Sequence, residues 1–213
     1  ATIINIPIAR DIALINDIKT LWMLWQAFRK NRFDIVLSVT PKAGLLSTIA
    51  GFFARIPIRI HWFTGQVWVT RHGVTRTILK AMDRLLVLFS THLLADSPSQ
   101  RLFLMTEKIV SATNISVIGH GSICGVDSVR FVPNQAAKDA VMRQHNIPTN
   151  AKIVLFLGRL NTDKGLHELA LAIDAVCQVV PEAYFLIVGP DENQLVDYIK
   201  IQCQAWLSQI RFH

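Results

Sequence analysis

Short apolar runs bounded by polar residues recur along the chain, and longer amphipathic stretches separate them. The runs are rich in Ile and Val with little alternation, which is typical of strands buried on both faces of a parallel sheet. They lie at residues 3–8, 34–39, 58–63, 91–95, 115–118, 152–157 and 184–188. Helical periodicity occupies 11–30, 42–54, 73–90, 98–107, 135–145, 163–179 and 191–209. Strand and helix alternate, and the pattern predicts an α/β fold of doubly wound architecture.

One stretch interrupts the alternation. Residues 119–134, GHGSICGVDSVRFVPN, combine three glycines, a proline and an asparagine, a composition typical of an interdomain linker. We therefore expect one domain over residues 1–118, which lacks its first strand-helix unit, and the start of a second over 135–213. Only two strands are predicted after the linker, the chain opens without methionine, and it closes on AWLSQIRFH inside a predicted helix. These features predict a fragment whose second domain is truncated.

Composition narrows the class of protein. The chain has 213 residues and is 51% hydrophobic, enough for a sizeable core. Its cysteines, Cys124, Cys177 and Cys203, are far apart and show no CxxC or Cys/His spacing, which predicts neither a disulfide framework nor a zinc site and fits a reducing, cytoplasmic setting. No apolar run reaches the roughly 18 to 20 residues of a membrane span, and the N-terminus lacks the pattern of a signal peptide.

Charge is divided unevenly along the chain. Residues 1–134 carry 15 Lys and Arg against 7 Asp and Glu, a net charge of +8, whereas residues 135–213 carry 7 against 8. A basic excess confined to one part of a chain indicates an anionic partner for that part.

The segment FLGRLNTDKGLHEL, residues 156–169, places two cations where a strand gives way to a helix. The strand ends at Gly158, and Arg159 and Lys164 follow close to the start of the helix expected from residue 163. Backbone N–H groups and the helix dipole favour an anion there, so two cations suggest a phosphate or diphosphate held by an arginine fork and a lysine point charge. The alternative is a solvated loop in which Lys164 pairs with Glu168 at i,i+4.

These residues carry a resemblance to a known family. The segment GRLNTDKGLHELALAIDAV, followed by YFLIVGPDENQL, resembles the start of the C-terminal domain of glycosyltransferase family 4, the retaining enzymes of GT-B fold. The family pattern of Gly-Arg-Leu and a later Lys-Gly is met by Gly158, Arg159, Leu160, Lys164 and Gly165. The resemblance implies that Arg159 and Lys164, with Gly158, hold the diphosphate of a nucleotide sugar.

The preceding half of the chain is similar to the acceptor-side domain of the bacterial family members that build surface polysaccharides such as capsule and lipopolysaccharide. The similarity is carried by DIVLSVTPKAGLLSTIAGFFARIPIRIHWFTGQVW, THLLADSPSQRLFL and GHGSICGVDSVRF. It implies transfer of a sugar, with retention, from a UDP- or GDP-sugar to a polyprenyl-diphosphate-linked saccharide, without a cofactor or a metal. The family's paired-glutamate motif and the glycine-rich loop of the acceptor domain do not occur in this chain, so we expect the 213 residues alone to have little or no activity.

His61 ends the predicted strand 58–63 and precedes a loop with Thr64, Gly65 and Gln66. By resemblance, His61 is a catalytic candidate that points into the cleft between domains and contacts the donor sugar; the alternative is a histidine satisfied by its neighbours. Gly65 allows close backbone approach, and its polar neighbours could bind a sugar or the acceptor, or form an ordinary turn.

Further polar residues follow two other predicted strands. Lys42 stands at the start of the helix 42–54 and is a candidate for the phosphate of a lipid-linked acceptor, with a surface lysine as the alternative. Asp96 and Ser97 close the strand 91–95, and we interpret them as mainly structural, with Ser97 or Ser99 as a helix N-cap; contact with the acceptor is the alternative.

Two predicted helices combine aromatic or aliphatic residues with basic ones. Helix 11–30 carries Trp22, Trp25 and Phe28 before Arg29, Lys30 and Arg32, and the segment 70–89 mixes Arg71, Arg76, Lys80 and Arg84 with Leu and Phe. Such surfaces suit anionic lipid, and they predict a peripheral protein on the inner face of the membrane. The alternative is a core-facing stripe with a solvated basic face.

Two other functions remain open from the sequence. A nucleotide-sugar epimerase shares the GT-B fold and needs no lipid acceptor. A non-catalytic basic module would bind membranes independently of Arg159 and Lys164. No nucleic-acid motif occurs, so we expect no nucleic-acid partner.

Overall fold

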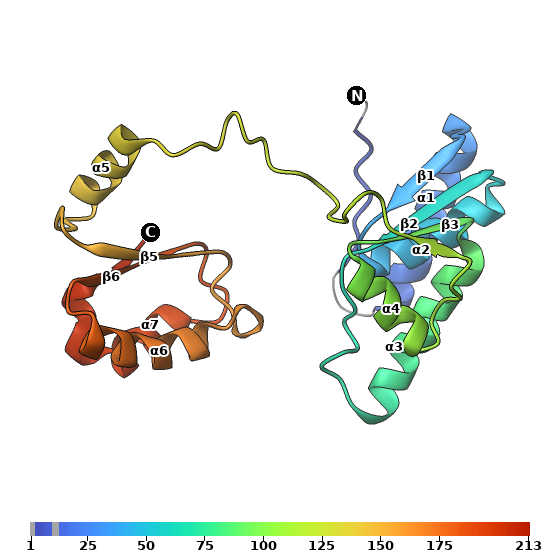
Figure 1. The fold of residues 1–213 in the computed structure, drawn as a ribbon. Helices are drawn as coiled ribbons and strands as arrows, with labels where there is room; N and C mark the ends of the chain where they lie inside the picture. Colours follow the sequence, from blue (N-terminus) through green and yellow to red (C-terminus); the bar gives the residue numbers. More distant parts are fainter. Residues whose placement is uncertain (1–2, 10–12) are drawn as a thin grey trace. The chain divides into compact units, whose positions relative to one another are not determined.

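The computed structural model describes residues 3–9 and 13–213 (Figure 1). The chain divides into two compact units, the first ending at Val126 and the second beginning at Asp127. In both units the strands pair in parallel and helices connect them. This arrangement confirms the predicted α/β class.

The first unit contains a four-stranded sheet. Its strands are β1 (Ile35–Ser38), β2 (Ile58–Phe63), β3 (His92–Ala95) and β4 (Ile115–Ser116), and they lie in chain order. Each agrees with a predicted apolar run, with shifts of one or two residues at the ends. The register places Ser38 beside His61 and Phe63 beside Ala95, so the carboxyl ends of β1, β2 and β3 reach the same edge.

The described residues of this unit form the helices α1 (Leu14–Asn31), α2 (Pro41–Phe53), α3 (Gly73–Phe89) and α4 (Pro98–Thr106). Pro41 and Pro98 begin α2 and α4, positions where the missing N–H costs nothing. The Ser97 hydroxyl accepts a hydrogen bond from the Gln100 backbone N–H at 3.1 Å. Ser97 is therefore the N-cap of α4, as predicted.

The core of the first unit lies on one face of its sheet. Phe63, Leu93 and Ala95 pack there against buried side chains of the helices, which include Leu45, Leu86 and Leu104. Side chains alternate along a strand, so the residues between them point to the other face. Leu37 on β1 lies on that other face, beside Ile60 of β2, and is 57% exposed. Helix α1 packs on α2 instead, through Leu24, Leu46 and Ala50.

The second unit contains a three-stranded parallel sheet of β5 (Lys152–Leu157), β6 (Ala183–Val188) and β7 (Ile210–Phe212). Its helices are α5 (Gln135–Gln144), α6 (Leu166–Val179) and α7 (Leu195–Gln202), with 3-10 turns at Thr162–Lys164 and Gln204–Gln209. Helices α6 and α7 lie on the same side of β5 and β6 (Figure 1). They bury Leu166, Ile173 and Ile199 against Phe185 and Ile187.

The strand predicted at residues 3–8 is wrong. Residues 3–9 have no regular secondary structure, and Pro7 removes a backbone donor that a ladder would need. The segment is held by helices: Ile6 packs against the cluster of Leu24, Leu46 and Ala50, and the Thr20 hydroxyl donates to the Pro7 carbonyl at 2.9 Å. Packing against helices therefore accounts for apolar residues that resemble a strand.

The prediction for the end of the chain is also wrong. The helix expected over 191–209 is a shorter α7 followed by a 3-10 turn, and residues 210–212 form a third strand rather than the end of a helix. Strand β7 has only three residues, too few for the alternation of apolar and polar positions to indicate a strand. The helix expected from residue 163 begins at Leu166, because Gly165 adopts a left-handed conformation with φ of 77° and separates it from the 3-10 turn.

Gly44 in α2 is required by its neighbour in the sheet. A Cβ added there would lie 2.5 Å from Cε1 and 2.6 Å from Nδ1 of the buried His61 ring. We expect Gly44→Ala to destabilise the first unit by about 1–3 kcal/mol, the usual cost of overpacking. Urea unfolding followed by tryptophan fluorescence measures this change, since Trp22, Trp25, Trp62 and Trp68 all belong to this unit.

Gly125→Ala is the matched control, because a Cβ at that glycine would meet nothing within 4 Å. Equal unfolding midpoints for the two variants would contradict the proposed contact between Gly44 and His61.

Candidate functional site

The loops that follow β5 and β6 run side by side. The Gly158 N–H donates to the Val188 carbonyl at 3.0 Å, and the Leu160 N–H donates to the Pro190 carbonyl at 2.8 Å. The Glu192 N–H then donates to the Leu160 carbonyl at 3.1 Å. The parallel ladder thus continues past the end of both strands, which places the residues after Gly158 next to those after Gly189.

Gly189 makes this close approach possible. It has a φ of 145°, and a Cβ there would lie 1.9 Å from the Gly158 carbonyl oxygen. Gly158 itself has room for a side chain, since an added Cβ would meet only the Phe156 ring at 3.7 Å. The sequence pattern singles out Gly158, but Gly189 is the residue at which a side chain would clash. The sequence Val-Gly-Pro at the end of β6 could have indicated this, because a glycine in a strand often marks the close approach of another backbone.

Arg159 and Lys164 lie in the loop between β5 and α6, as expected, but their surroundings differ. Nη1 of Arg159 donates to both carboxylate oxygens of Glu192, at 3.0 and 3.2 Å, and the Arg159 side chain is 47% exposed. Lys164 is exposed. Among the described residues it forms no ion pair, so the alternative pairing with Glu168 is absent there.

His61 lies inside the first unit. Its ring is 1% exposed, Nδ1 lies 2.9 Å from the Ser38 hydroxyl, and the Phe63 ring packs edge-on at a centroid distance of 4.6 Å. Burial lowers the pKa of His61 to about 4, so the ring is neutral near neutral pH. The expectation that His61 points outward into a cleft is therefore wrong for this structure: residues 61 and 63 of β2 share the face that packs against helices.

The loop after β2 presents Thr64 and Gly65 to solvent, whereas Gln66 is half-buried. Nε2 of Gln66 is buried without a hydrogen-bond partner among the described residues, and the same holds for Nε1 of Trp62 and Oδ1 of Asp96. Trp62 lies beside Leu94, and Asp96, two residues beyond, continues the ladder by donating its N–H to the Phe63 carbonyl. Alternation therefore puts Trp62 and Asp96 on one face of the sheet, at its carboxyl edge.

Buried polar atoms without partners are uncommon in folded proteins. A donor and an acceptor of this kind on one face of the carboxyl edge, with a further donor on Gln66 in the loop after β2, suit a ligand that is rich in hydroxyl groups. The sequence pattern does not single out Trp62, and it favours a structural role for Asp96 with acceptor contact as the alternative. The signal in the sequence was Trp62's place at the end of a strand, on the opposite face from His61.

Lys42 joins two helices. Its Nζ lies 2.7 Å from Oδ1 of Asp17 in α1, and both side chains are largely buried. The hydrogen bond from Lys42 is the main cause that lowers the pKa of the Asp17 carboxyl. An acceptor phosphate would have to share Lys42 with this carboxylate.

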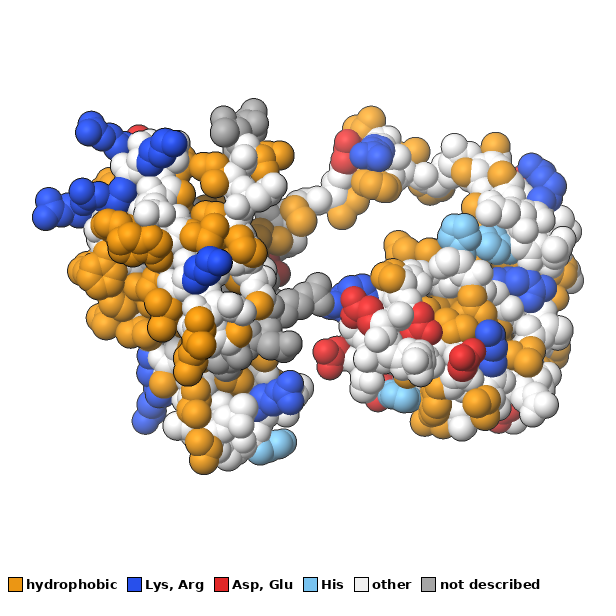
Figure 2. All heavy atoms as spheres, turned by 180° about the vertical axis from the view of Figure 1, so that it is seen from behind, with side chains coloured by type: hydrophobic (Ala, Val, Ile, Leu, Met, Phe, Trp, Pro, Cys, Tyr) orange, Lys and Arg blue, Asp and Glu red, His pale blue; other side chains and the backbone are white. Residues whose placement is uncertain are grey.

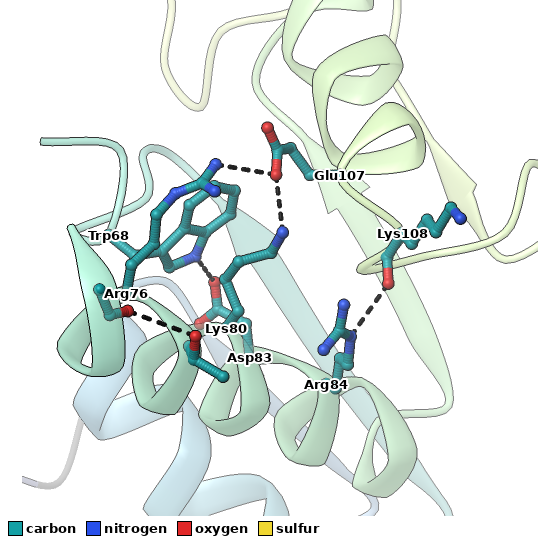
Figure 3. Close-up of polar contacts among 9 residues, drawn as sticks. Trp68, Arg76, Lys80, Asp83, Arg84, Glu107 and Lys108 are labelled. Atoms are coloured by element: carbon teal, nitrogen blue, oxygen red, sulfur yellow. Dashed lines mark hydrogen bonds and ion pairs between the residues drawn. The ribbon is translucent and has the colours of Figure 1, made fainter. Parts of the chain in front are cut away.

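A tryptophan anchors the far end of the loop after β2 (Figure 3). Trp68 is 1% exposed and stacks on Phe103 at a centroid distance of 5.4 Å. Its Nε1 donates to Oδ2 of Asp83 at 2.7 Å. Burial raises the pKa of the Asp83 carboxyl, and the indole N–H supplies the hydrogen bond that a buried carboxyl needs.

Basic side chains of α3 turn toward this tryptophan (Figure 3). The Arg76 guanidinium and the Lys80 ammonium lie 5.3 and 5.2 Å from the Trp68 ring centroid, and both contact Oε2 of Glu107, at 2.9 and 2.7 Å. Arg84 donates to the Lys108 carbonyl. Three of the four basic residues predicted to meet lipid in the segment 70–89 thus make contacts within the unit.

The outward face of α3 is apolar instead. Val74, Ile78, Leu85 and Leu88 recur at helical spacing and are 41–76% exposed. On α1, Trp22 is 56% exposed, while Trp25 and Phe28 pack against the buried cluster. Figure 2 shows Lys and Arg interleaved with hydrophobic side chains over the first unit, and both signs of charge on the second. In the described part of the chain, no helix has the length and apolarity that a transmembrane segment requires.

Comparison with known proteins agrees with the fold and the loop. The family model for Glycosyl transferases group 1 matches residues 137–205. The capsular polysaccharide biosynthesis glycosyltransferase CapM of Staphylococcus aureus is 31% identical over 190 residues, which cover 89% of this chain and 49% of CapM. A UDP-Gal:alpha-D-GlcNAc-diphosphoundecaprenol alpha-1,3-galactosyltransferase of Escherichia coli is 27% identical, over 93% of this chain and 50% of that protein.

Solved structures show the same fold at lower identity. Anabaena Alr3699/HepE in complex with UDP-glucose superposes with a TM-score of 0.73 at 19% identity, over 91% of this chain and 51% of that one. A UDP-GlcNAc 2-epimerase from Neisseria meningitidis bound to UDP-GlcNAc has a TM-score of 0.60 at 16% identity, over 96% and 56%. The chain spans about half the length of the curated relatives that it matches.

The solved structures place the chain in the GT-B fold class. Within that fold the chain is similar to the group 1 glycosyltransferases of bacterial surface-polysaccharide type, since the family model matches residues 137–205 with the Arg159 loop and the two curated relatives align over most of the chain. The resemblance inferred from the sequence is confirmed.

The buried His61 predicts a pH-dependent stability. The unfolded chain protonates His61 near pH 6.5, whereas the folded protein keeps it neutral down to about pH 4. Between these values the unfolded state binds more protons, so this stabilisation is complete above pH 6.5 and is lost as the pH falls toward 4. The difference between the two pKa values corresponds to at most roughly 3 kcal/mol.

Urea unfolding of His61→Gln is therefore expected to depend less steeply on pH than that of the wild type across this interval. His72→Gln, a change at an exposed histidine, serves as the control and is expected to keep the wild-type slope. Parallel profiles for the wild type and His61→Gln would contradict the assignment.

Proposed function

We propose that the protein transfers a sugar from a nucleotide-sugar donor to a lipid-linked saccharide or polysaccharide precursor, with retention of anomeric configuration. One observation carries this proposal: the loop with Arg159 and Lys164 follows a parallel strand at its carboxyl edge, where ligands bind in open α/β sheets. The names of the two curated relatives support a polysaccharide product and a diphospholipid acceptor. The UDP-glucose complex of the Anabaena protein supports a UDP-sugar donor.

The chemistry of this loop fits a departing nucleoside diphosphate. Negative charge builds up on the diphosphate as the bond to the sugar breaks, and fixed cations beside it lower the barrier. Arg159 can offer a planar fork to phosphate oxygens, and Lys164 a mobile point charge. Gly158 continues the strand into this loop.

The acceptor is proposed to bind at the carboxyl edge of the sheet in the first unit. Gln66, Trp62 and Asp96 supply the buried polar atoms without partners, and the exposed Thr64 and Gly65 lie in the same loop. His61 lies on the opposite face of β2 from Trp62, where it contacts Ser38 of β1 and packs against Gly44 of α2. Its proposed role is to hold these three elements together. We further propose that these 213 residues by themselves have little or no transferase activity.

An epimerase is the second candidate within the fold, and the TM-score of 0.60 to a UDP-GlcNAc 2-epimerase is the observation that favours it. The two curated relatives are transferases at higher identity, 31% and 27%. A non-catalytic basic module is the third candidate. It requires no role for Arg159 or Lys164, so loss of both would leave its binding intact.

Arg159→Ala and Lys164→Ala are each expected to weaken binding of UDP or GDP by about tenfold to a hundredfold, the range for a lost charge-assisted hydrogen bond. Calorimetric titration of the 213-residue chain measures this. In the same two variants of the intact protein, the transfer of sugar from UDP- and GDP-sugars to a membrane extract is expected to fall by a similar factor.

Lys152→Ala is the control, since Lys152 stands at the opposite end of β5 and pairs with Glu182 at 2.7 Å. Unchanged nucleotide binding in both loop variants would remove the basis for the transferase proposal. Consumption of the donor without any acceptor would favour the epimerase.

We also propose that the first unit lies peripherally on the inner, anionic face of the membrane. The apolar stripe of α3, formed by Val74, Ile78, Leu85 and Leu88, is exposed. The residues up to 134 carry a net charge of +8. An apolar helix face within a basic surface binds anionic lipid through both burial and charge.

Replacement of Ile78 and Leu85 by Asn is expected to weaken cosedimentation with phosphatidylglycerol-containing vesicles by roughly tenfold or more, because two partly inserted side chains are lost. The control is the double change of Leu171 and Val179 to Asn on α6, where both residues are also exposed. Equal vesicle binding by the two double variants would rule out the α3 stripe as the contact.

A further inference from the structure

Glu192 connects the candidate donor site to a buried residue. Oε2 of Glu192 accepts from Nη1 of Arg159 at 3.0 Å and from Nδ2 of Asn161 at 3.0 Å. Asn161 is only 7% exposed, whereas Arg159 is about half exposed. A side chain fixed in the interior thus holds a carboxylate, and the carboxylate holds the arginine.

The backbone fixes Glu192 from the other side. Its N–H donates to the Leu160 carbonyl at 3.1 Å, and Leu160 pairs with Asp191 in an isolated parallel bridge. Leu160 is 2% exposed. Asp191 accepts the N–H groups of Leu195 and Val196 at the start of α7, at 2.9 and 3.1 Å. Glu192 therefore projects from a segment that is held at both ends.

Only one nitrogen of Arg159 is used by this contact. Both carboxylate oxygens of Glu192 accept hydrogen bonds from Nη1 of Arg159. Among the described residues, Nε and Nη2 of Arg159 have no hydrogen-bond partner. These two nitrogens form the side edge of the guanidinium, which can bind two phosphate oxygens at once. A carboxylate on Nη1 and a phosphate on the Nε–Nη2 edge can bind the same arginine.

The Asn161 amide has a determined direction. Its Nδ2 must face the Glu192 carboxylate, because a reversed amide would place two acceptors together. In that direction Oδ1 is buried and lacks a hydrogen-bond partner in the described part of the chain. An unsatisfied buried acceptor is costly, so folding alone gives little reason for Asn at this position.

We propose that Asn161 and Glu192 are positioning residues that orient Arg159 for the diphosphate of the donor. Asn161 fixes the carboxylate of Glu192, and the carboxylate holds Nη1 so that the Nε–Nη2 edge faces the phosphate oxygens. The inference rests on the proposed nucleotide-sugar function and adds two residues to its site. Glu192 is not a competitor for the phosphate here, because the two anions use different edges of the guanidinium.

A double-mutant cycle tests this role. UDP and GDP are each titrated calorimetrically into the 213-residue chain and into its Glu192→Gln, Arg159→Ala and combined variants. Glu192→Gln keeps the side-chain shape and is expected to weaken binding of the preferred nucleotide about three- to tenfold, since it loses one charged hydrogen bond. In the Arg159→Ala background the same change is expected to have no effect, because Glu192 acts only through the arginine.

Asn161→Ala is expected to weaken nucleotide binding in the same direction and, again, only while Arg159 is present. Glu182→Gln is the matched control: Glu182 also pairs with a cation, Lys152, but at the far end of the sheet. Its nucleotide affinity is expected to equal that of the wild type. Urea unfolding midpoints of all variants distinguish a local effect from loss of the fold.

The outcomes separate the two proposals. Nucleotide binding that weakens in Arg159→Ala but is unchanged or tighter in Glu192→Gln would overturn the positioning role and leave the proposed function intact. Equal losses from Glu192→Gln with and without Arg159 would also overturn it, because the carboxylate would then act on the loop alone. Absence of UDP and GDP binding by the wild type, or binding indifferent to Arg159, would overturn both proposals.

Discussion

Parallel pairing of strands is the constraint on which the rest of this structure depends. It sends every carboxyl end in a sheet to the same edge, so loops distant in sequence begin next to one another. In the second unit the pairing of β5 with β6 continues as backbone hydrogen bonds from Gly158 to Glu192. Because Gly189 lacks a side chain, the two loops approach closely enough for Arg159 and Glu192 to meet. The candidate donor site is thus a direct extension of the sheet.

Buried polar groups explain much of the first unit. His61 is neutral and contacts Ser38, and Asp83 accepts from the Trp68 indole. Each of these groups is costly to bury without a partner, and each partner comes from a different element. The polar contacts therefore fix how β1, β2 and α3 pack. Trp62, Gln66 and Asp96 depart from this rule at the carboxyl edge, which is why that edge is the proposed acceptor site.

Charge has different uses in the two units. The positive excess of the first unit partly serves internal contacts, since Arg76 and Lys80 share Glu107 beside Trp68. The surface left by this arrangement is an apolar stripe on α3, with Lys and Arg elsewhere over the unit. In the second unit a cation and a carboxylate are paired at the candidate site itself. Net charge alone would not have distinguished these two situations.

The sequence by itself determined the α/β class, most of the strands and helices, and the group 1 glycosyltransferase resemblance, because strand and helix periodicity and the Gly-Arg-Leu and Lys-Gly spacing are local patterns. It failed where tertiary contacts decide. Residues 3–8 are apolar because Ile6 packs on helices, and β7 is too short to show a period and forms by pairing with β6. The inward direction of His61 follows from β2's register against β1. The contact of Asn161 and Arg159 with Glu192 spans more than 30 residues, so only the pairing of β5 with β6 could bring them together.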